Sequence, residues 1–371
     1  MKTLRLLLAL TLPLGVVGHL TAAGSTNPLR PDPSSSSASL RTAAAAKGIL
    51  FGTAVKASSI KDDALYREII LREFSIVTAE NELKMAATQP AEGRFDFTKA
   101  DIVVDFATRN GLEIRGHTLC WNADRYLPKW VLARTFTREE ATDLLRTHIH
   151  TVMKRYRGRI KYWDVVNEAV ANVKSPDTPL LFHEFWSKHL GDDYIELAFR
   201  FAHEADPDAV LFYNDYDHGK SLSQKSDRIY EMLKRLVQAG VPIHGVGLQM
   251  HCNLTLPPKY EEMKANFERL GKLGLRVQIT ELDVYPVGVP GTLEERLARQ
   301  AAVYHDVVAA ALDSKVCEAI VMWGFTDKFN QRGINLRKNL PPDTPTLLWL
   351  FDETFQPKPA YFGVMRALQR P

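Results

Sequence analysis

Short apolar runs alternate with amphipathic helical stretches from about residue 47 onward, and this alternation limits the folds open to the chain. The runs are rich in Val, Ile and aromatic residues and are bounded by polar segments, a pattern typical of buried strands. Eight strands are predicted: Ile49–Val55, Ser75–Glu80, Glu113–Leu119, Ile160–Asn167, Val210–Asn214, Gly245–Met250, Arg276–Glu281 and Ala319–Phe325. Eight strands that alternate with helices over about 320 residues predict a single closed (β/α)8 barrel.

The stretches between these strands carry helix start signals. Thr137–Glu140 and Thr292–Glu295 are capping boxes, each followed by apolar residues spaced three and four apart. The competing fold is an open doubly wound sheet, which prefers a glycine-rich phosphate-binding turn after its first strand. The segment Phe51–Val55 offers no such turn. The isolated Gly245-Val-Gly247 lacks a third glycine, so tight packing explains it better than phosphate binding.

The N-terminus differs in composition from the rest of the chain. A basic start and an apolar stretch from Leu6 to Val17 precede small residues that favour cleavage after Ala23. This pattern predicts a signal peptide over residues 1–23, because ~12 apolar residues are too few to span a bilayer. Residues 24–46 are rich in Ser, Pro and Ala and are predicted to be a flexible lead. Residues 47–371 are predicted to form the folded domain of a secreted or periplasmic protein.

Charge and cysteine content argue against several classes of function. The chain has 47 Lys and Arg against 44 Asp and Glu, so loss of Lys2 and Arg5 with the signal peptide would leave it almost neutral. Such a balance carries no signature for nucleic acid or anionic membranes and favours a neutral substrate. The cysteines are odd in number and far apart, so we expect buried small apolar residues rather than a disulfide framework at Cys120, Cys252 and Cys317.

The fourth and the seventh predicted strands each lead to a glutamate beside another polar residue. One run reaches Asn167 and Glu168, and the other reaches Glu281 two residues before Asp283. A buried strand gains nothing from an ionised carboxylate at its end, since desolvating an unpaired charge costs several kcal/mol. In a barrel the carboxyl ends of the strands meet at one pocket, where two carboxylates can hydrolyse a glycosidic bond. One such glutamate would more often belong to a structural ion pair, but two beside other polar residues favour an active site.

The ends of the other strands add polar and aromatic side chains to the same rim: Glu80, Asn81, Lys84, His117, Trp121, Tyr213, Asn214, Asp215, Tyr216, Gln249, His251, Trp323 and Asp327. Carboxylates, amides and indoles around one pocket suit a sugar. A metal site made of His117, His251 and Asp283 is the alternative. The spacing argues against it, because the one His-x-His pair, His148-Ile-His150, lies in a predicted helix where the two rings point to different faces. We therefore expect no metal and no other cofactor.

Short blocks containing these residues occur in order from about Lys47 to Leu368: Thr78-Ala-Glu-Asn-Glu-Leu-Lys-Met85, Gly116-His-Thr-Leu-Cys-Trp121, Leu127-Pro-Lys-Trp-Val131, Trp163-Asp-Val-Val-Asn-Glu-Ala169, Phe212-Tyr-Asn-Asp-Tyr216, Gly245-Val-Gly-Leu-Gln-Met-His251, Ile279-Thr-Glu-Leu-Asp283, Trp323-Gly-Phe-Thr-Asp327 and Pro357-Lys-Pro-Ala-Tyr361. Together they resemble glycoside hydrolase family 10, the xylanases. So many ordered blocks make chance similarity negligible.

The resemblance implies an endo-acting β-1,4-xylanase that retains anomeric configuration, with the glycoside hydrolase domain over residues 47–371. It implies that Glu168 is the acid/base and Glu281 the nucleophile. Asn167 would hydrogen-bond the 2-hydroxyl of the sugar at the cleavage point. His251, supported by Asp283, would hold Glu281 oriented and ionised. The implied partner is xylan or a xylo-oligosaccharide, and we expect a monomer with no membrane contact after signal removal.

The resemblance also implies sugar-binding positions on the glycone side of the cleavage point: Glu80, Asn81, Lys84, His117, Trp121, Gln249 and Trp323. We expect Asn214 to belong to the same substrate-binding set. Two residues depart from the family pattern, since Gln331 stands where a second tryptophan is common and Met85 replaces a frequent aromatic. Both are expected at the sugar-binding rim. A β-1,4-glucanase with the same chemistry and a non-catalytic sugar-binding barrel are the alternatives.

Overall fold

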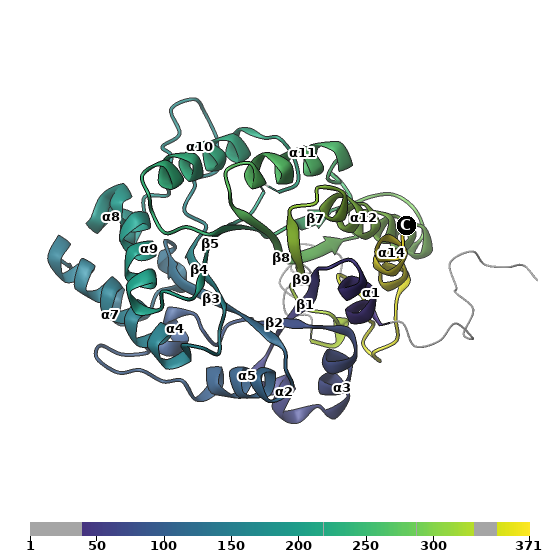
Figure 1. Cartoon of the computed structure of the whole chain (residues 1–371), viewed down its shortest axis with the longest axis horizontal. Helices are drawn as coiled ribbons and strands as arrows, with labels where there is room; N and C mark the ends of the chain where they lie inside the picture. Colours follow the sequence, from purple (N-terminus) through teal and green to yellow (C-terminus); the bar gives the residue numbers. More distant parts are fainter. Residues whose placement is uncertain (1–38, 218, 287, 330–346) are drawn as a thin grey trace, which may run out of the picture.

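The computed structural model describes residues 39–371 except 218, 287 and 330–346, and its centre is a ring of parallel strands surrounded by helices (Figure 1). The ring contains β1 Leu50–Val55, β2 Ile76–Ala79, β3 Glu113–Trp121, β4 Tyr162–Asn167, β5 Val210–Asp215, β6 Gly245–Leu248, β8 Arg276–Tyr285 and β9 Cys317–Met322. Each strand pairs with the next, and β1 also pairs with β9, so the sheet closes on itself. The predicted (β/α)8 barrel is confirmed.

One short strand was not predicted. β7, His251–Asn253, lies outside the ring and pairs in parallel with the last residues of β8, with His251 opposite Asp283. It forms because β8 is ten residues long and extends past the end of β6, which leaves part of its edge without a neighbour. This extension brings a histidine and an aspartate to adjacent positions at the carboxyl end of the barrel.

Helices occupy the outside of the ring (Figure 1). They are α2 Ala57–Asp62, α3 Ala64–Glu73, α4 Met85–Thr88, α5 Thr98–Arg109, α6 Lys129–Leu132, α7 Arg138–Tyr156, α8 Phe185–Leu190, α9 Tyr194–Ala205, α10 Gln224–Gln238, α11 Tyr260–Gly271, α12 Leu293–Asp313 and α14 Pro359–Leu368, with 3-10 turns η1 Asp124–Tyr126, η2 Gly191–Asp193 and η3 Asp327–Phe329. The predicted capping boxes are present at Thr137 of α7 and Thr292 of α12, where each hydroxyl accepts from the backbone of the glutamate three residues later.

The flexible lead predicted over residues 24–46 is wrong at its end. Residues Leu40–Ala46 form helix α1, and Ser39 caps it. Leu40 is fully buried, and its backbone N–H donates to Glu73 Oε2 at 2.9 Å, so α1 is held against α3 and also contacts α14. A segment with one leucine among small residues carries little apolar signal, but packing against two neighbouring helices is enough to order it. Residues 24–38 lie outside the described part of the chain.

Side chains from several strands fill the interior of the ring. Ile76, Tyr162, Phe212 and Val321 form a small apolar cluster, whereas the main core lies between the ring and the helices. Gly245 and Gly247 on β6 confirm the packing explanation, because a Cβ would lie 2.3 Å from the ring of Phe212 at the first and 2.3 Å from Asn214 Oδ1 at the second. Glycine at 247 therefore makes room for a polar side chain at the rim.

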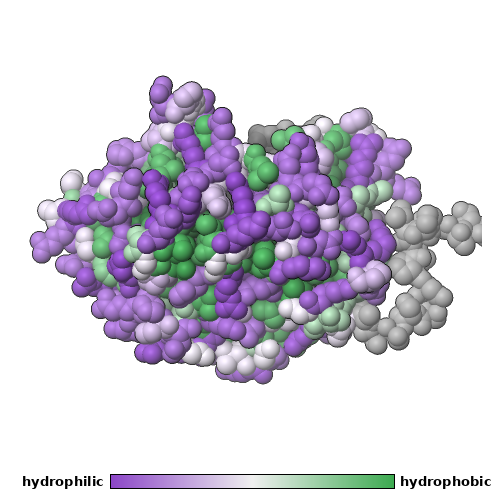
Figure 2. Space-filling view, turned by 45° about the horizontal axis from the view of Figure 1, so that its top comes forward, coloured by the Kyte–Doolittle hydropathy of each residue, from purple (hydrophilic) through white to green (hydrophobic). Residues whose placement is uncertain are grey.

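The surface and the cysteines agree with a globular chain that has its apolar residues inside. Polar residues cover most of the face in Figure 2, and apolar side chains show only between them. All three cysteines are buried and free. Within the described ranges, no helix combines the length and the apolar content needed to cross a bilayer.

Candidate active site

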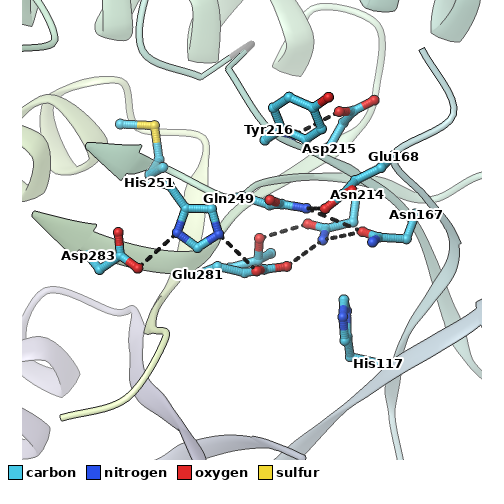
Figure 3. A network of polar contacts seen from close by, with 12 residues as sticks. His117, Asn167, Glu168, Asn214, Asp215, Tyr216, Gln249, His251, Glu281 and Asp283 are labelled. Atoms are coloured by element: carbon cyan, nitrogen blue, oxygen red, sulfur yellow. Dashed lines mark hydrogen bonds and ion pairs between the residues drawn. The ribbon is translucent and has the colours of Figure 1, made fainter. Parts of the chain in front are cut away.

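The carboxyl ends of four neighbouring ring strands and the start of β7 bring the predicted catalytic side chains together (Figure 3). Asn167 and Glu168 lie at the end of β4, Asn214 near the end of β5, and Gln249 directly after β6. Glu281 and Asp283 come from β8, and His251 comes from β7. Hydrogen bonds join these residues into one chain that runs from Asp283 to Glu168.

Glu281 is held in the ionised form. Its side chain is buried, Oε2 lies 3.1 Å from His251 Nε2, and Oε1 accepts from Asn214 Nδ2 at 2.9 Å. Burial alone would raise the pKa of Glu281, but the hydrogen bond from His251 and the positive charges of His117 and His251 outweigh it and lower the pKa to about 2. The other ring nitrogen of His251 lies 3.0 Å from Asp283 Oδ2, which orients the ring.

The surroundings of Glu168 shift its pKa in the opposite direction. Burial raises its pKa, and although the hydrogen bond from Gln249 acts against this, the negative charges of Glu281 and Asp215 add to the rise. Gln249 Nε2 donates to Glu168 Oε1 at 2.9 Å, and Trp121 Nε1 donates to Oε2 at 3.2 Å. Its backbone has φ of 54°, a left-handed conformation rare for a glutamate. Such strain persists only where the surroundings impose it.

Asn167 presents an unused donor beside these glutamates. Its Oδ1 accepts from Asn214 Nδ2 at 2.8 Å and from Gln249 Nε2 at 3.4 Å. Its Nδ2 is buried and has no hydrogen-bond partner among the residues that the structure describes. Buried polar atoms are nearly always paired, so this amide group is suited to a ligand hydroxyl.

Asn214 lies between Asn167 and Glu281. Its Nδ2 donates to both residues, and its Oδ1 accepts from Thr280 Oγ1 at 2.7 Å. These contacts position Asn167 and Glu281, and the expected contact of Asn214 with the substrate stays a prediction. Sequence reasoning missed Thr280, because nothing in a Thr-Glu pair on a strand shows which amide the threonine reaches.

Lys84 lies at the centre of the predicted glycone side. Its Nζ donates to Asn81 Oδ1 at 2.9 Å and lies 5.3 Å from the ring centre of Trp121 and 5.8 Å from that of Trp323. Glu80 Oε2 lies 3.6 Å from Lys56 Nζ at the same edge. The structure therefore gathers a cation, a carboxylate, an amide and two indoles around one part of the rim, as predicted.

His117 contacts both the barrel interior and this part of the rim. Its Nδ1 lies 2.9 Å from Asp164 Oδ2, and its ring packs edge-on against Trp323 with centroids 5.2 Å apart. The position is almost fully buried, and the charge of His117 contributes to the low pKa of Glu281. His117 is thus brought to the site, between the barrel interior and the aromatic rim.

A pocket of about 420 Å³ adjoins Glu168 and is lined by residues that include Trp121, Arg125, Glu184 and Tyr216. Tyr126 stacks on Trp121 with ring centroids 3.7 Å apart, and the sequence analysis did not include this second ring. Its position five residues after Trp121 was the available signal. Trp121 and Glu168 therefore border both this pocket and the predicted glycone side.

Two residues that depart from the family pattern are expected at the sugar-binding rim. Met85, at the start of α4, is buried among the residues of the main core, and its place at the rim stays a prediction. Gln331 lies outside the described residues. Within the described ranges, no group of three or more His, Cys, Asp or Glu side chains is arranged to hold a metal ion.

A closed barrel whose carboxyl rim holds two glutamates, one with a lowered pKa and one with a raised pKa, is the arrangement expected of a glycoside hydrolase. Comparison with known families agrees, since the family model described as glycosyl hydrolase family 10 matches residues 39–367. The chain belongs to this family.

Individual relatives are similar over most of the chain. Endo-1,4-beta-xylanase B of Thermotoga neapolitana is 38% identical over 317 residues, which are 84% of this chain and 85% of that protein. Xylanase 10B from Thermotoga petrophila RKU-1, solved in complex with xylobiose, is 38% identical with a TM-score of 0.82, covering 90% of this chain and 98% of that one. Exoglucanase XynX of Acetivibrio thermocellus is 34% identical over 326 residues, 84% of this chain and 28% of that protein.

Proposed function

We propose that the protein is an endo-β-1,4-xylanase that cleaves internal bonds of xylan with retention of configuration. The observation that carries this proposal is that two glutamates in one hydrogen-bonded chain have pKa values shifted in opposite directions. Hydrogen bonds from His251 and Asn214 help to lower the pKa of Glu281, whereas burial and nearby negative charge raise that of Glu168; these shifts favour an ionised Glu281 and a protonated Glu168. A nucleophile and a general acid need these two states at the same pH.

In the first step Glu281 attacks the anomeric carbon while Glu168 gives its proton to the departing glycosidic oxygen. The bond to the leaving sugar breaks, and a covalent glycosyl-enzyme forms on Glu281. Because this ester carries no charge, the negative field that favoured protonated Glu168 weakens. Glu168 then takes a proton from water as the water attacks the anomeric carbon, and Glu281 leaves as a carboxylate.

The choice of xylan rests on the sugar contacts and on the relatives. The unpaired Asn167 Nδ2 suits the 2-hydroxyl of the sugar at the cleavage point, where a hydrogen bond strengthens in the transition state. Trp121 and Trp323 offer apolar faces on the glycone side. A similar solved protein binds xylobiose, and a similar curated protein is an endo-1,4-beta-xylanase.

Product analysis tests the proposal directly. The purified protein is incubated with xylan, carboxymethyl cellulose and mannan, beside a Glu281→Ala variant. We expect xylo-oligosaccharides from xylan alone and at least a 10⁴-fold loss in the variant, because one nucleophile carries both steps. Retention is read from the anomer first formed, by NMR of fresh product. Release of the inverted anomer, or turnover by the variant, would contradict the mechanism.

A β-1,4-glucanase is the second candidate, favoured by one observation, the similarity to Exoglucanase XynX. The two-glutamate chemistry would be unchanged, and only contacts to the 5-substituent of the sugar would differ. Activity chiefly on carboxymethyl cellulose in the same assay would support this candidate. Absence of products on all three polysaccharides would instead favour a non-catalytic sugar-binding barrel.

We further propose that the protein is exported, with residues 1–23 removed as a signal peptide, and that it acts as a monomer. The basic and apolar pattern of these residues supports export. Mass measurement of protein recovered outside the cytoplasm should give a chain that starts at Gly24. Light scattering should give the mass of one chain. A start at Met1, or the mass of two chains, would count against these proposals.

A further inference from the structure

A buried ion pair next to Glu168 has no part in the mechanism above. Asp215, the last residue of β5, has its Oδ1 2.9 Å from Nζ of Lys225 in the first turn of α10. The Asp215 side chain has no exposed surface, and that of Lys225 is 6% exposed. Taking both charges out of water costs free energy, so a buried pair of this kind is weak evidence of a contribution to stability. The contacts of the pair at the active site indicate its role instead.

Every recorded contact of the Asp215 carboxylate is with a donor. It accepts from Tyr213 Oη at 2.5 Å, from Tyr216 N at 2.7 Å and from Val170 N at 3.4 Å, besides Lys225 Nζ. Burial raises the pKa of Asp215, whereas the charge of Lys225 and the hydrogen bonds from Tyr213, Lys225 and Tyr216 act against this rise. These contacts favour the ionised form of Asp215 and so a negative charge at this position.

The pair also holds the backbone that follows Glu168. Val170 N donates to Asp215 Oδ2, and Lys225 Nζ lies 3.3 Å from Asn172 Oδ1, so both charges contact the loop two and four residues after Glu168. On the other side Glu168 N donates to the Asn214 carbonyl at 2.8 Å. These contacts hold the left-handed backbone of Glu168 from both directions.

Asp215 and Tyr216 lie beside Glu168 in the same view (Figure 3). The charge of Asp215 raises the pKa of Glu168, together with burial and the charge of Glu281, whereas the charge of His117 lowers it. Lys84 also acts on Glu168 from the β2 loop, and the Asp215 carboxylate itself faces Lys225, Tyr213, Tyr216 and Tyr194.

We propose that Asp215, held by Lys225, is the positioning residue of Glu168: it anchors the backbone after Glu168 and sets the pH up to which Glu168 keeps its proton. The inference rests on the proposed role of Glu168 as general acid. The structural basis is the set of contacts to Val170 and Asn172 and the negative charge that Asp215 adds to that of Glu281 near Glu168. Lys225 keeps that charge ionised and in place.

The test is the basic limb of the pH profile of kcat/KM, which reports the ionisation of the essential acid in the free enzyme. Asp215→Asn keeps the size of the side chain and removes the negative charge, so the limb should move to lower pH. Asp215→Asn with Lys225→Met leaves no unpaired buried cation, which makes it the variant expected to fold if the single substitution does not. The basic limb of the double variant should also move to lower pH, but by less than that of Asp215→Asn, because the Lys225 charge is absent as well.

The chain provides a matched control. Asp327 forms a buried ion pair with Lys358 through Oδ2 and Nζ at 2.5 Å, and it follows β9, which lies opposite β4 in the ring. Asp327→Asn should lower stability as much as Asp215→Asn does but leave the basic limb unmoved. Glu168→Ala, assayed on a nitrophenyl xylobioside whose leaving group needs no proton, should lose the basic limb.

These measurements distinguish a failure of the role of Asp215 from a failure of the proposed role of Glu168. A basic limb that stays in place in both Asp215 variants, while Glu168→Ala lacks it, overturns the role of Asp215 and leaves that of Glu168 intact. A basic limb that persists in Glu168→Ala overturns the assignment of Glu168 itself. An equal shift in Asp327→Asn would show that any buried charge moves the limb, which also overturns the inference.

Discussion

Glu168 and Glu281 are the same residue type in the same pocket, and their neighbours give them different chemistry. Glu281 is bonded by His251 and Asn214, and these donors stabilise its ionised form more than burial opposes it. Glu168 accepts from Gln249 and Trp121, but burial and the negative charges beside it have the larger effect. The opposite pKa shifts of the two glutamates therefore come from burial, hydrogen-bond partners and neighbouring charges and not from the residue type.

The acid limb of activity should depend on His251. In the proposed mechanism Glu281 must be ionised to attack, and because its pKa is lowered from 4.5 to about 2, the wild type should stay active as pH falls through 4. His251→Gln keeps a side chain of similar size but removes the imidazole charge, so the pKa of Glu281 should rise and the acid limb should move to higher pH. The pH profile of kcat/KM between 3.5 and 7, normalised to pH 6, measures the shift. An acid limb identical to that of the wild type would count against His251 as the partner of Glu281.

At the scale of elements, the strands were predicted well and the exceptions have a common cause. The ring strands follow from their own apolar residues, and both capping boxes mark helix starts as the sequence indicates. β7 and α1 were missed because neither has a strong local signal. β7 depends on the free edge of β8, and α1 depends on a hydrogen bond to Glu73 and contact with α14.

The contribution of α1 to stability can be measured with one substitution. Leu40 is fully buried, so Leu40→Ala should lower the free energy of unfolding by about 2–5 kcal/mol. Ala45→Ser, at an exposed position of the same helix, should change it by no more than about 0.5 kcal/mol. Urea unfolding of both variants measures the difference. Equal small effects would mean that α1 is not part of the cooperative fold.

At the scale of the whole molecule, a buried polar group inside the ring connects the barrel to its site. Arg115 on β3 donates to both oxygens of Asp164 on β4 at 3.0 and 2.7 Å, and its Nε donates to Gln278 on β8 at 2.7 Å. The same Asp164 carboxylate bonds His117, which reaches the rim. One ion pair therefore ties strands from different parts of the ring to the glycone side of the site.

Removing this arginine should destabilise the barrel. Arg115→Met leaves a buried carboxylate without its main partner, which costs about 3–5 kcal/mol of unfolding free energy. Arg155 forms an ion pair with Asp101 at 2.5 Å on the surface and provides the control, since Arg155→Met should cost no more than about 1 kcal/mol. The loss of unfolding free energy in each variant is obtained from its denaturant midpoint, with one dependence of free energy on denaturant concentration used for all proteins. A loss no larger than that of the control would contradict a structural role for Arg115.

The sequence by itself determined the barrel, the rim and the two glutamates, because strand and helix periodicity is local and a closed parallel barrel places the carboxyl ends of all its strands at one rim. Only the tertiary structure decided which polar groups meet there. Asn214 turned out to bind Asn167 and Glu281, and Asp215 to bind Lys225 and the loop after Glu168. Except for Asp215 and Lys225, these partners lie more than 40 residues apart in the chain. Such contacts depend on how elements pack, so no local pattern of residues predicts them.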